Sequence, residues 1–289
     1  MLRTRVITAL VMLAFLYVAA VILEPFFFAL CITLVVLIAS SEWGALMGLN
    51  GPVNKGVFIL ISAVLMLGIA PFIGLKPAAS ALDSSAVMTV CIVGVIFWLW
   101  AFKLMRDFPN KTATWTNTIV SALIGYLVLL PTWVALLQLK YLQSDGVLVF
   151  ALIAMVSVAD IGAYFVGRAF GNKKLAPQLS PGKSWAGFWG GVASCGLLSI
   201  ALLLLLNRFV TPLSLMQSVS LIVLMLVVAV FSVLGDLFES MFKRNQGIKD
   251  SGSILPGHGG ILDRIDSLTA AAPLFVVSLL LVLGDAVWA

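Results

Sequence analysis

Charge is scarce in this sequence. Only 10% of its 289 residues are charged, whereas 62% are hydrophobic. Soluble domains carry about 25% charged residues, and a water-soluble fold could not bury so much apolar surface. The composition therefore excludes a soluble enzyme and indicates that the bilayer is the solvent.

Histidine and cysteine are also rare. His258 is the single histidine, and Cys31, Cys91 and Cys195 lie inside apolar runs without ligand spacing. These features argue against zinc, whose sites use His and Cys ligands, and against a disulfide framework. We expect the cysteines to be small packing residues. We also expect no nucleic-acid partner, because no stretch combines aromatic and basic residues as a nucleic-acid groove would.

Long hydrophobic runs, by contrast, are abundant. A spanning helix needs about 20 mostly apolar residues. The runs predict nine such helices, over residues 5–23, 26–48, 56–75, 86–102, 118–138, 147–167, 186–206, 217–237 and 268–287. The predicted fold class is therefore all-α, a polytopic membrane protein with about nine transmembrane helices. We expect a single membrane domain, 1–289, with N-terminal spans over about 1–140 and catalytic spans and loops over about 147–289.

The start of the chain and its basic residues predict the orientation. Arg3 and Arg5 precede the first apolar run as in a signal peptide, but no clear cleavage motif follows, so we expect this span to be retained. With the N-terminus in the cytoplasm, most Lys and Arg residues fall inside, and the exceptions are Lys76, Lys140 and Arg208. The positive-inside rule then predicts a multi-pass protein of the inner (cytoplasmic) membrane, with long cytoplasmic loops at 168–185 and 238–267.

Carboxylates occur where they are costly. An ionisable group inside a membrane helix costs about 2.5–3.5 kcal/mol and is a functional candidate by default. Asp160 lies in the sixth span, near its cytoplasmic end, although a hydrogen bond to a neighbouring helix would also explain it. Asp236, Glu239 and Lys243 share one helical face at the end of the eighth span. Either a nearby cation such as Lys243 or Arg244, or a bound divalent cation, could compensate the two acids.

A second acidic pair follows the loop. Asp263 and Asp266 lie on one face of a helix predicted to begin near Ile261, where one of them could simply suit the helix dipole. Because these residues and Asp236 flank the same loop, their carboxylates could face each other around a hard cation such as Mg²⁺. Glu42, alone near the end of the second span, suits a structural hydrogen bond as well as a site role, so we do not include it in the candidate site.

Both long loops contain basic residues that suit anions. In the second, the turn "LPGHGG" could cradle phosphate with its backbone N–H groups, and nearby Lys and Arg could add charge-assisted bonds. Membrane topology or snorkelling would explain each cation individually. The first loop contains "SPGKS", but a Walker A motif needs glycine where Pro177 stands and a strand–loop–helix unit, so we exclude an ATPase.

The run from Ser240 to Asp266 resembles the signature of the phosphatidate cytidylyltransferases, or CDP-diacylglycerol synthases. The matching residues are Ser240, Phe242, Lys243, Arg244, Lys249, Asp250, Pro256, His258, Gly259, Gly260, Asp263, Arg264 and Asp266. The stretches "ADIGAYFVGRAFGNKKLAPQLSPGKSWAGF" and "SVLGDLFES" are similar to further conserved regions. The resemblance covers roughly the C-terminal half, from Asp160, whereas the N-terminal half is similar to bacterial members only in length and span pattern. Ala186 departs from the acidic or amide residue of many members.

The resemblance implies an activity and its participants. CTP and phosphatidic acid would give CDP-diacylglycerol and pyrophosphate, with Mg²⁺ as cofactor, in a homodimeric enzyme embedded in membrane lipid. It implies that Asp236 and Asp263 hold the metal and belong to the catalytic residues, with Asp266, Lys243 and Arg264. It further implies substrate contacts from Asp160, Ser180, Lys183, Arg244, Lys249, Asp250, His258, Gly259 and Gly260.

Two other functions remain open at this point. Intramembrane carboxylates also suit an ion-coupled transporter, although the charges gather at one edge of the membrane and no inverted repeat is evident. A cytidylyltransferase acting on another lipid phosphate, such as a polyprenyl phosphate, is the nearer alternative. The role of His258 also stays open, since it could donate to a phosphate or shape the turn.

Overall fold

The computed structural model describes residues 2–49, 51–209 and 212–284, which are almost entirely helical. The helices are α1 (Leu2–Tyr17), α2 (Pro25–Leu46), α3 (Pro52–Phe72), α4 (Ser84–Asp107), α5 (Thr118–Leu142), α6 (Val147–Phe170), α7 (Trp185–Phe209), α8 (Leu215–Asn245) and α9 (Leu262–Leu283). A π-helical turn (Val18–Ile22) extends α1, and a 3₁₀ turn (Thr112–Thr114) precedes α5. In this part of the chain nine helices are long and apolar enough to cross a membrane. The predicted all-α, polytopic fold class is confirmed.

The two predicted long loops are shorter than expected. In the first, β1 (Lys174–Ala176) and β2 (Ser180–Ser184) form an antiparallel hairpin, so the "SPGKS" stretch is a strand that leads directly into α7. In the second, α8 continues to Asn245, beyond the predicted end of its span at residue 237, and α9 begins at Leu262. The predicted spans end at charged residues because their bounds follow hydropathy, whereas the helices continue through these charged residues. The predicted last span ends at residue 287, and its residues 285–287 lie outside the described part.

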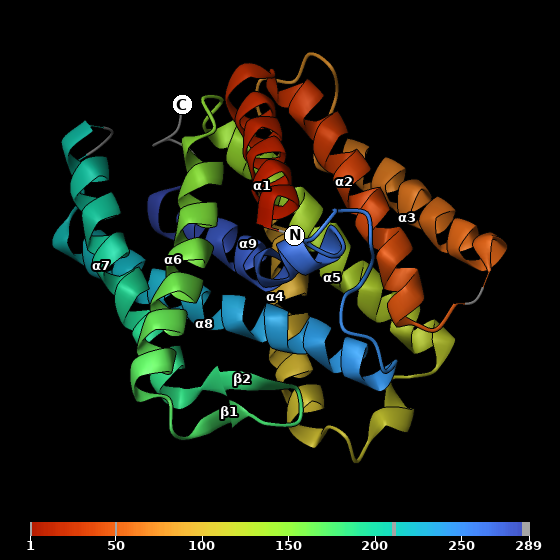
Figure 1. Ribbon diagram of the computed structural model, residues 1–289. Coiled ribbons are helices and arrows are strands. Elements are labelled where there is room, and N and C mark those ends of the chain that lie inside the picture. The colour runs from red at the N-terminus through yellow and green to blue at the C-terminus, as the bar shows by residue number, and fades with distance from the viewer. Residues whose placement is uncertain (1, 50, 210–211, 285–289) are drawn as a thin grey trace.

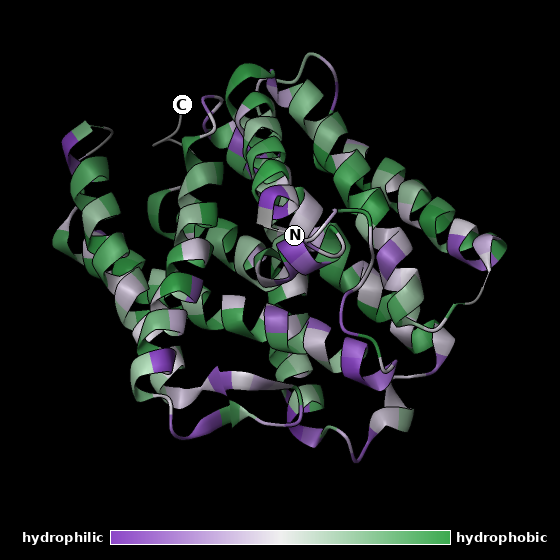
Figure 2. Cartoon of the chain, in the orientation of Figure 1, coloured by the Kyte–Doolittle hydropathy of each residue, from purple (hydrophilic) through white to green (hydrophobic). Residues whose placement is uncertain are grey.

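The helices surround α8 and α9, as Figure 1 shows. α8 crosses the middle of the molecule, with α6 and α7 on one side and α2 and α3 on the other, and the β1–β2 hairpin lies along the lower edge. In Figure 2 hydrophilic residues gather at this edge, on the hairpin and the end of α8, whereas the helices above are mostly hydrophobic. This distribution gives the molecule one distinct polar end.

Close helix contacts bring the polar segments together. A side chain at Gly187 would lie 2.7 Å from the Ala163 carbonyl oxygen, and one at Gly191 would lie 2.7 Å from that of Ala159. Glycines thus let α7 pack directly on the backbone of α6, which is the small-residue packing typical of membrane helices. As a result, the hairpin that precedes α7 lies beside the polar end of α6.

An aromatic cluster fixes the polar end of α8. The ring of Phe242 is 4.8 Å from that of Trp43 on α2 and 4.6 Å from that of Trp115, which follows the 3₁₀ turn. One turn earlier, Phe238 is 5.3 Å from Trp98 on α4. All five rings are almost fully buried. Offset and tilted aromatic pairs of this kind add stability beyond their buried area, so the opposite, polar face of α8 has a rigid support.

Candidate active site

The close approach of α8 and α9 places their acidic residues side by side. A side chain at Gly235 on α8 would lie 2.3 Å from the carbonyl oxygen of Asp266 on α9, so only glycine fits this crossing. Asp236 follows Gly235 directly, and Asp236 and Glu239 both act electrostatically on Asp266. Of the predicted meeting of Asp236, Asp263 and Asp266, the structure thus brings together Asp236 and Asp266, whereas Asp263 is engaged by Lys243 and two backbone amides.

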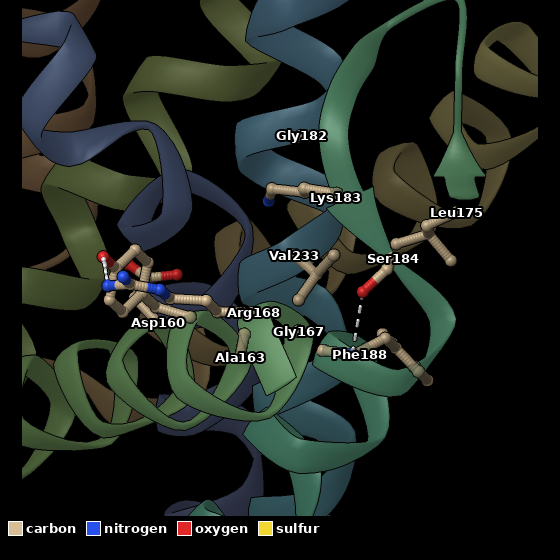
Figure 3. A pocket seen from close by; sticks show the side chains of 12 residues that line it. Asp160, Ala163, Gly167, Arg168, Leu175, Gly182, Lys183, Ser184, Phe188 and Val233 are labelled. Carbon is tan, nitrogen blue, oxygen red and sulfur yellow. Dashed lines mark hydrogen bonds between the residues drawn. The ribbon is translucent and has the colours of Figure 1, made fainter. Parts of the chain in front are cut away.

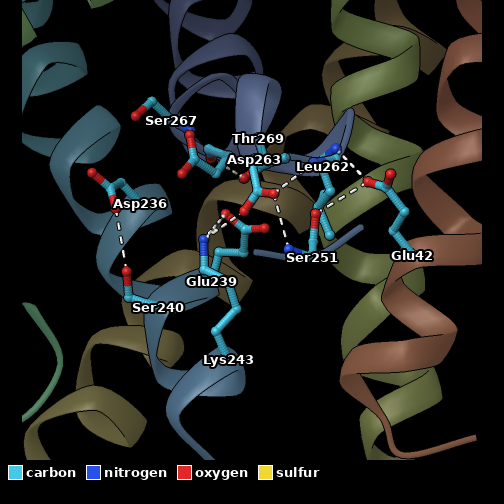
Figure 4. Close-up of polar contacts among 12 residues, drawn as sticks. Glu42, Asp236, Glu239, Ser240, Lys243, Ser251, Leu262, Asp263, Ser267 and Thr269 are labelled. Carbon is cyan, nitrogen blue, oxygen red and sulfur yellow. Dashed lines mark hydrogen bonds and ion pairs between the residues drawn. The ribbon is translucent and has the colours of Figure 1, made fainter. Parts of the chain in front are cut away.

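Lys243 connects two further carboxylates. Its Nζ lies 3.1 Å from Glu239 Oε2, one turn earlier on α8, and 2.7 Å from Asp263 Oδ1 on α9 (Figure 4). The three side chains are at most 12% exposed. An ion pair buried to this degree is held in place because separating it would leave an uncompensated charge. Lys243 thus ties α8 to the first turn of α9.

The second oxygen of Asp263 orders the loop between α8 and α9. Asp263 Oδ2 accepts hydrogen bonds from the backbone N–H groups of Ser251, at 2.9 Å, and Gly260, at 2.8 Å. Gly259, with a φ of 81°, makes the turn that brings the Gly260 amide into this position. Both Asp263 oxygens are therefore engaged, and the carboxylate has a fixed orientation.

The hairpin contributes the other lysine. Lys183 on β2 places its Nζ 2.6 Å from Asp236 Oδ2, and both side chains remain partly exposed. Lys183 also lines a cavity of about 320 Å³ between α6, the hairpin, α7 and α8, together with Asp160 and Arg168 (Figure 3). Lys183 and Asp236 are the main charges acting on Asp160. α6 and the hairpin thus bring opposite charges to one cavity, and Lys183 links this cavity to Asp236 on α8.

An apolar cavity adjoins this charged one. It measures about 510 Å³ and lies between the end of α4, the hairpin, α7 and α8. Leu175, Phe188 and Val233 line both cavities. A charged compartment next to an apolar one suits an amphipathic substrate with an anionic headgroup.

The donor set suits a hard divalent cation. The carboxylates of Asp160, Asp236, Glu239, Asp263 and Asp266 outnumber the lysines that contact them, Lys183 and Lys243. In addition, Glu239 Oε1 is buried without a hydrogen-bond partner in the described part of the chain. No group of three or more His, Cys, Asp or Glu in that part could hold a metal ion as it stands. Mg²⁺ would therefore need water and substrate phosphate as further ligands, as is usual for Mg²⁺ sites in proteins.

The other predicted site residues lie around this centre. Ser180 begins β2, and Arg244 Nε donates to the Leu179 carbonyl at 3.3 Å, which links α8 to the hairpin. Lys249, Asp250 and Arg264 are exposed. His258 is partly buried, and its Nδ1 has no hydrogen-bond partner among the described residues.

Sequence reasoning missed two acidic residues. The sequence puts Glu239 on the face of Asp236 and Lys243 without assigning it to the candidate site, and the structure places it between Lys243 and Asp266. The sequence does not assign Glu42 to the site either, and the structure buries its carboxylate against the start of α9. The available signal was the same for both: a carboxylate in or beside an apolar span is costly unless something compensates it.

Comparison with known proteins is consistent with this geometry. Residues 3–282 match the model of the cytidylyltransferase family. The sequence is 41% identical over 279 residues to a phosphatidate cytidylyltransferase of Pseudomonas aeruginosa, and the alignment covers 96% of this chain and 97% of that protein. It is 37% identical over 287 residues to a phosphatidate cytidylyltransferase of Haemophilus influenzae, and that alignment covers 95% of this chain and 97% of that protein.

Proposed function

The chain belongs to the cytidylyltransferase family, and from this premise we propose that it transfers CMP from CTP to phosphatidic acid. The products are CDP-diacylglycerol and pyrophosphate, and the chain is a CTP-dependent nucleotidyltransferase of phospholipid biosynthesis. The observation that supports a site for this activity is the charged cavity lined by Asp160, Arg168 and Lys183, which lies beside an apolar cavity, with Lys183 also paired to Asp236 of α8.

The reaction requires positioning more than proton transfer. A phosphate oxygen of the lipid attacks the α-phosphorus of CTP, the new P–O bond forms, and the bond to the β-phosphate breaks to release pyrophosphate. The attacking oxygen is already anionic near neutral pH, so no strong general base is needed. Catalysis of this type depends on holding two polyanions together and stabilising the charge that develops on the leaving group.

The residues divide this work between them. Lys183, Lys243, Arg244 and Arg264 are the cations proposed to contact phosphate oxygens, with Ser180, Lys249, His258 and the amides of Gly259 and Gly260 as further contacts. Asp236 and Asp263 are the proposed Mg²⁺ ligands, with Asp266 adjacent. When bound there, Mg²⁺ would neutralise charge on the CTP phosphates and on pyrophosphate. The ion pairs to Lys183 and Lys243 hold Asp236 and Asp263 in defined orientations before substrate arrives.

The membrane arrangement follows from the same reasoning. CTP is water-soluble and phosphatidic acid is a lipid, so the reaction belongs where the charged cavity opens beside the acyl chains. We assign the polar end to the cytoplasmic side of the inner membrane, together with the N-terminus, because most basic residues lie in the segments on that side. The apolar cavity is the proposed groove for the acyl chains. A homodimer is the assembly that the family resemblance supports.

An assay with purified protein tests the substrate assignment. Protein in detergent is incubated with labelled CTP and either phosphatidic acid, a polyprenyl phosphate or no lipid, each with Mg²⁺ or with EDTA. Labelled CDP-diacylglycerol is expected only with phosphatidic acid and Mg²⁺. A product from polyprenyl phosphate alone would reassign the substrate, the absence of any labelled lipid would contradict the enzyme assignment, and full activity in EDTA would remove the metal.

A further inference from the structure

Glu42 makes an unusual set of contacts across the molecule. It lies near the end of α2, it is 4% exposed, and its carboxylate reaches the start of α9, more than two hundred residues later in the sequence (Figure 4). Oε1 accepts from the Ile261 N–H at 3.0 Å, and Oε2 accepts from the Leu262 N–H at 2.7 Å and from Ser251 Oγ at 3.1 Å. We propose that Glu42 is a positioning residue that fixes the metal-binding and catalytic carboxylate Asp263, an inference that rests on the proposed function.

A carboxylate is the group that this location requires. The first N–H groups of a helix have no partner within the helix, and they carry a partial positive charge that favours an anion. Ile261 stands at the N-cap of α9 and has no side-chain acceptor to offer. Glu42 supplies this cap from another helix, through charge-assisted hydrogen bonds that are stronger than neutral ones. The same contacts compensate the buried charge of Glu42.

Two short connections lead from Glu42 to Asp263. Ser251 donates its hydroxyl to Glu42 and its backbone N–H to Asp263 Oδ2 at 2.9 Å, so one residue bridges the two carboxylates. Gly260, whose N–H donates to Asp263 Oδ2 at 2.8 Å, immediately precedes the Ile261 and Leu262 amides that Glu42 holds. Any shift of Glu42 therefore moves both backbone donors that orient Asp263.

The surroundings are shaped to the carboxylate. A side chain at Gly252 would lie 2.4 Å from Glu42 Oε1, and one at Gly260 would lie 2.5 Å from Glu42 Oε2, so both positions have no room for a Cβ. The base of Glu42 is equally fixed. The neighbouring Trp43 packs on Phe242 and donates its indole N–H to the Ser121 carbonyl at 3.0 Å. α2, α5 and α8 are thereby joined where Glu42 reaches the loop.

Glu42→Gln is the main test, with Glu24→Gln as the matched control. Glu24 is exposed at the other end of α2 and serves as its N-cap residue. The introduced amide keeps the size of the side chain but turns one acceptor into a donor that faces N–H or O–H donors. We expect kcat for CDP-diacylglycerol formation to fall at least tenfold while KM for CTP changes less than threefold. Hydrogen exchange of amides 250–262 should accelerate while that of α5 stays the same, and the control should behave as wild type.

Ser251→Ala provides a second, milder variant. It removes the hydroxyl bridge to Glu42 but keeps the Ser251 N–H that Asp263 accepts. We expect a smaller loss of kcat at an unchanged melting temperature, and no additional loss when it is combined with Glu42→Gln, because Glu42→Gln already disrupts the connection through Ser251. If Glu42→Gln fails to fold, Ser251→Ala decides the question alone.

Two outcomes would overturn the inference. One is a Glu42→Gln variant with wild-type kcat and wild-type hydrogen exchange of amides 250–262. If Glu42→Gln does not fold, the corresponding outcome is a wild-type kcat in Ser251→Ala. The other is a pair of losses that simply multiply in the double variant. A wild-type protein that makes no CDP-diacylglycerol would instead contradict the proposed function, and the exchange measurement would still decide whether Glu42 orders the loop.

Discussion

Gly235→Ala should disable the site without touching any charged group. The added Cβ would lie 2.3 Å from the Asp266 carbonyl oxygen and 3.1 Å from Ser267 Cα. These are backbone atoms, so no side-chain rotation can make room. An ordinary contact begins at 3.4 Å, so α8 and α9 must separate locally by about 1 Å.

The expected loss follows from this displacement. Overpacking of this kind costs about 1–3 kcal/mol of stability, and the gain in helix propensity from Gly to Ala, about 1 kcal/mol, offsets part of it. The activity should suffer more, because a 1 Å misplacement of catalytic groups costs about 100-fold in rate. We therefore expect a folded protein with a slightly lowered melting temperature and about 1% of wild-type turnover.

The measurement is CDP-diacylglycerol formation per folded molecule, with folding judged by size-exclusion chromatography and thermal unfolding in the same detergent. Gly68→Ala on α3 is the matched control, because a side chain there would meet no atom within 4 Å. It should retain wild-type activity. Gly235→Ala turnover within threefold of wild type, at an unchanged melting temperature, would refute the claim that this crossing sets the geometry of the site.

Two further substitutions separate chemistry from stability. Lys183→Met removes the cation that contacts Asp236, and turnover should fall about 100- to 1,000-fold, whereas Lys76→Met, an exposed residue outside the site, should leave the rate unchanged. Lys140→Met removes a fully buried amine that donates to the Ala20 carbonyl at 2.7 Å. The free energy of unfolding should fall by about 1–3 kcal/mol, because buried acceptors lose their donor, while activity per folded molecule stays normal. A large loss of turnover at an unchanged melting temperature would contradict a purely structural role for Lys140.

The sequence predicted the spans well, because their length and apolar composition are local properties. It also predicted that Asp236, Asp263 and Asp266 could face each other, because their helices flank the same loop. The structure brings Asp266 close to Asp236, whereas Asp263 pairs with Lys243. The start of α9 agrees with the helix predicted to begin near Ile261, whereas the end of α8 was less predictable. Hydropathy treats Glu239 and Lys243 as the end of a span, yet on a helix they compensate each other, so α8 continues.

Contacts between distant segments were beyond local reasoning. Nothing in the sequence near Glu42 indicates that its partners are the amides of Ile261 and Leu262. Likewise, the pairing of Lys183 with Asp236 depends on how the hairpin packs against α8. The hairpin itself was predicted as a loop, because its strands are short and rich in Gly, Pro and Lys, and only their pairing makes them strands.

The charges that we propose for the reaction also assemble the site. Lys183 joins the hairpin to α8, Lys243 joins α8 to α9, and Glu42 joins α2 to the loop and α9. Each contact compensates a carboxylate that would be costly alone in an apolar surrounding, so each carboxylate requires that its partner segment be in place. A site of this kind orders its segments by their mutual contacts, so the loss of one partner is expected to disturb the others.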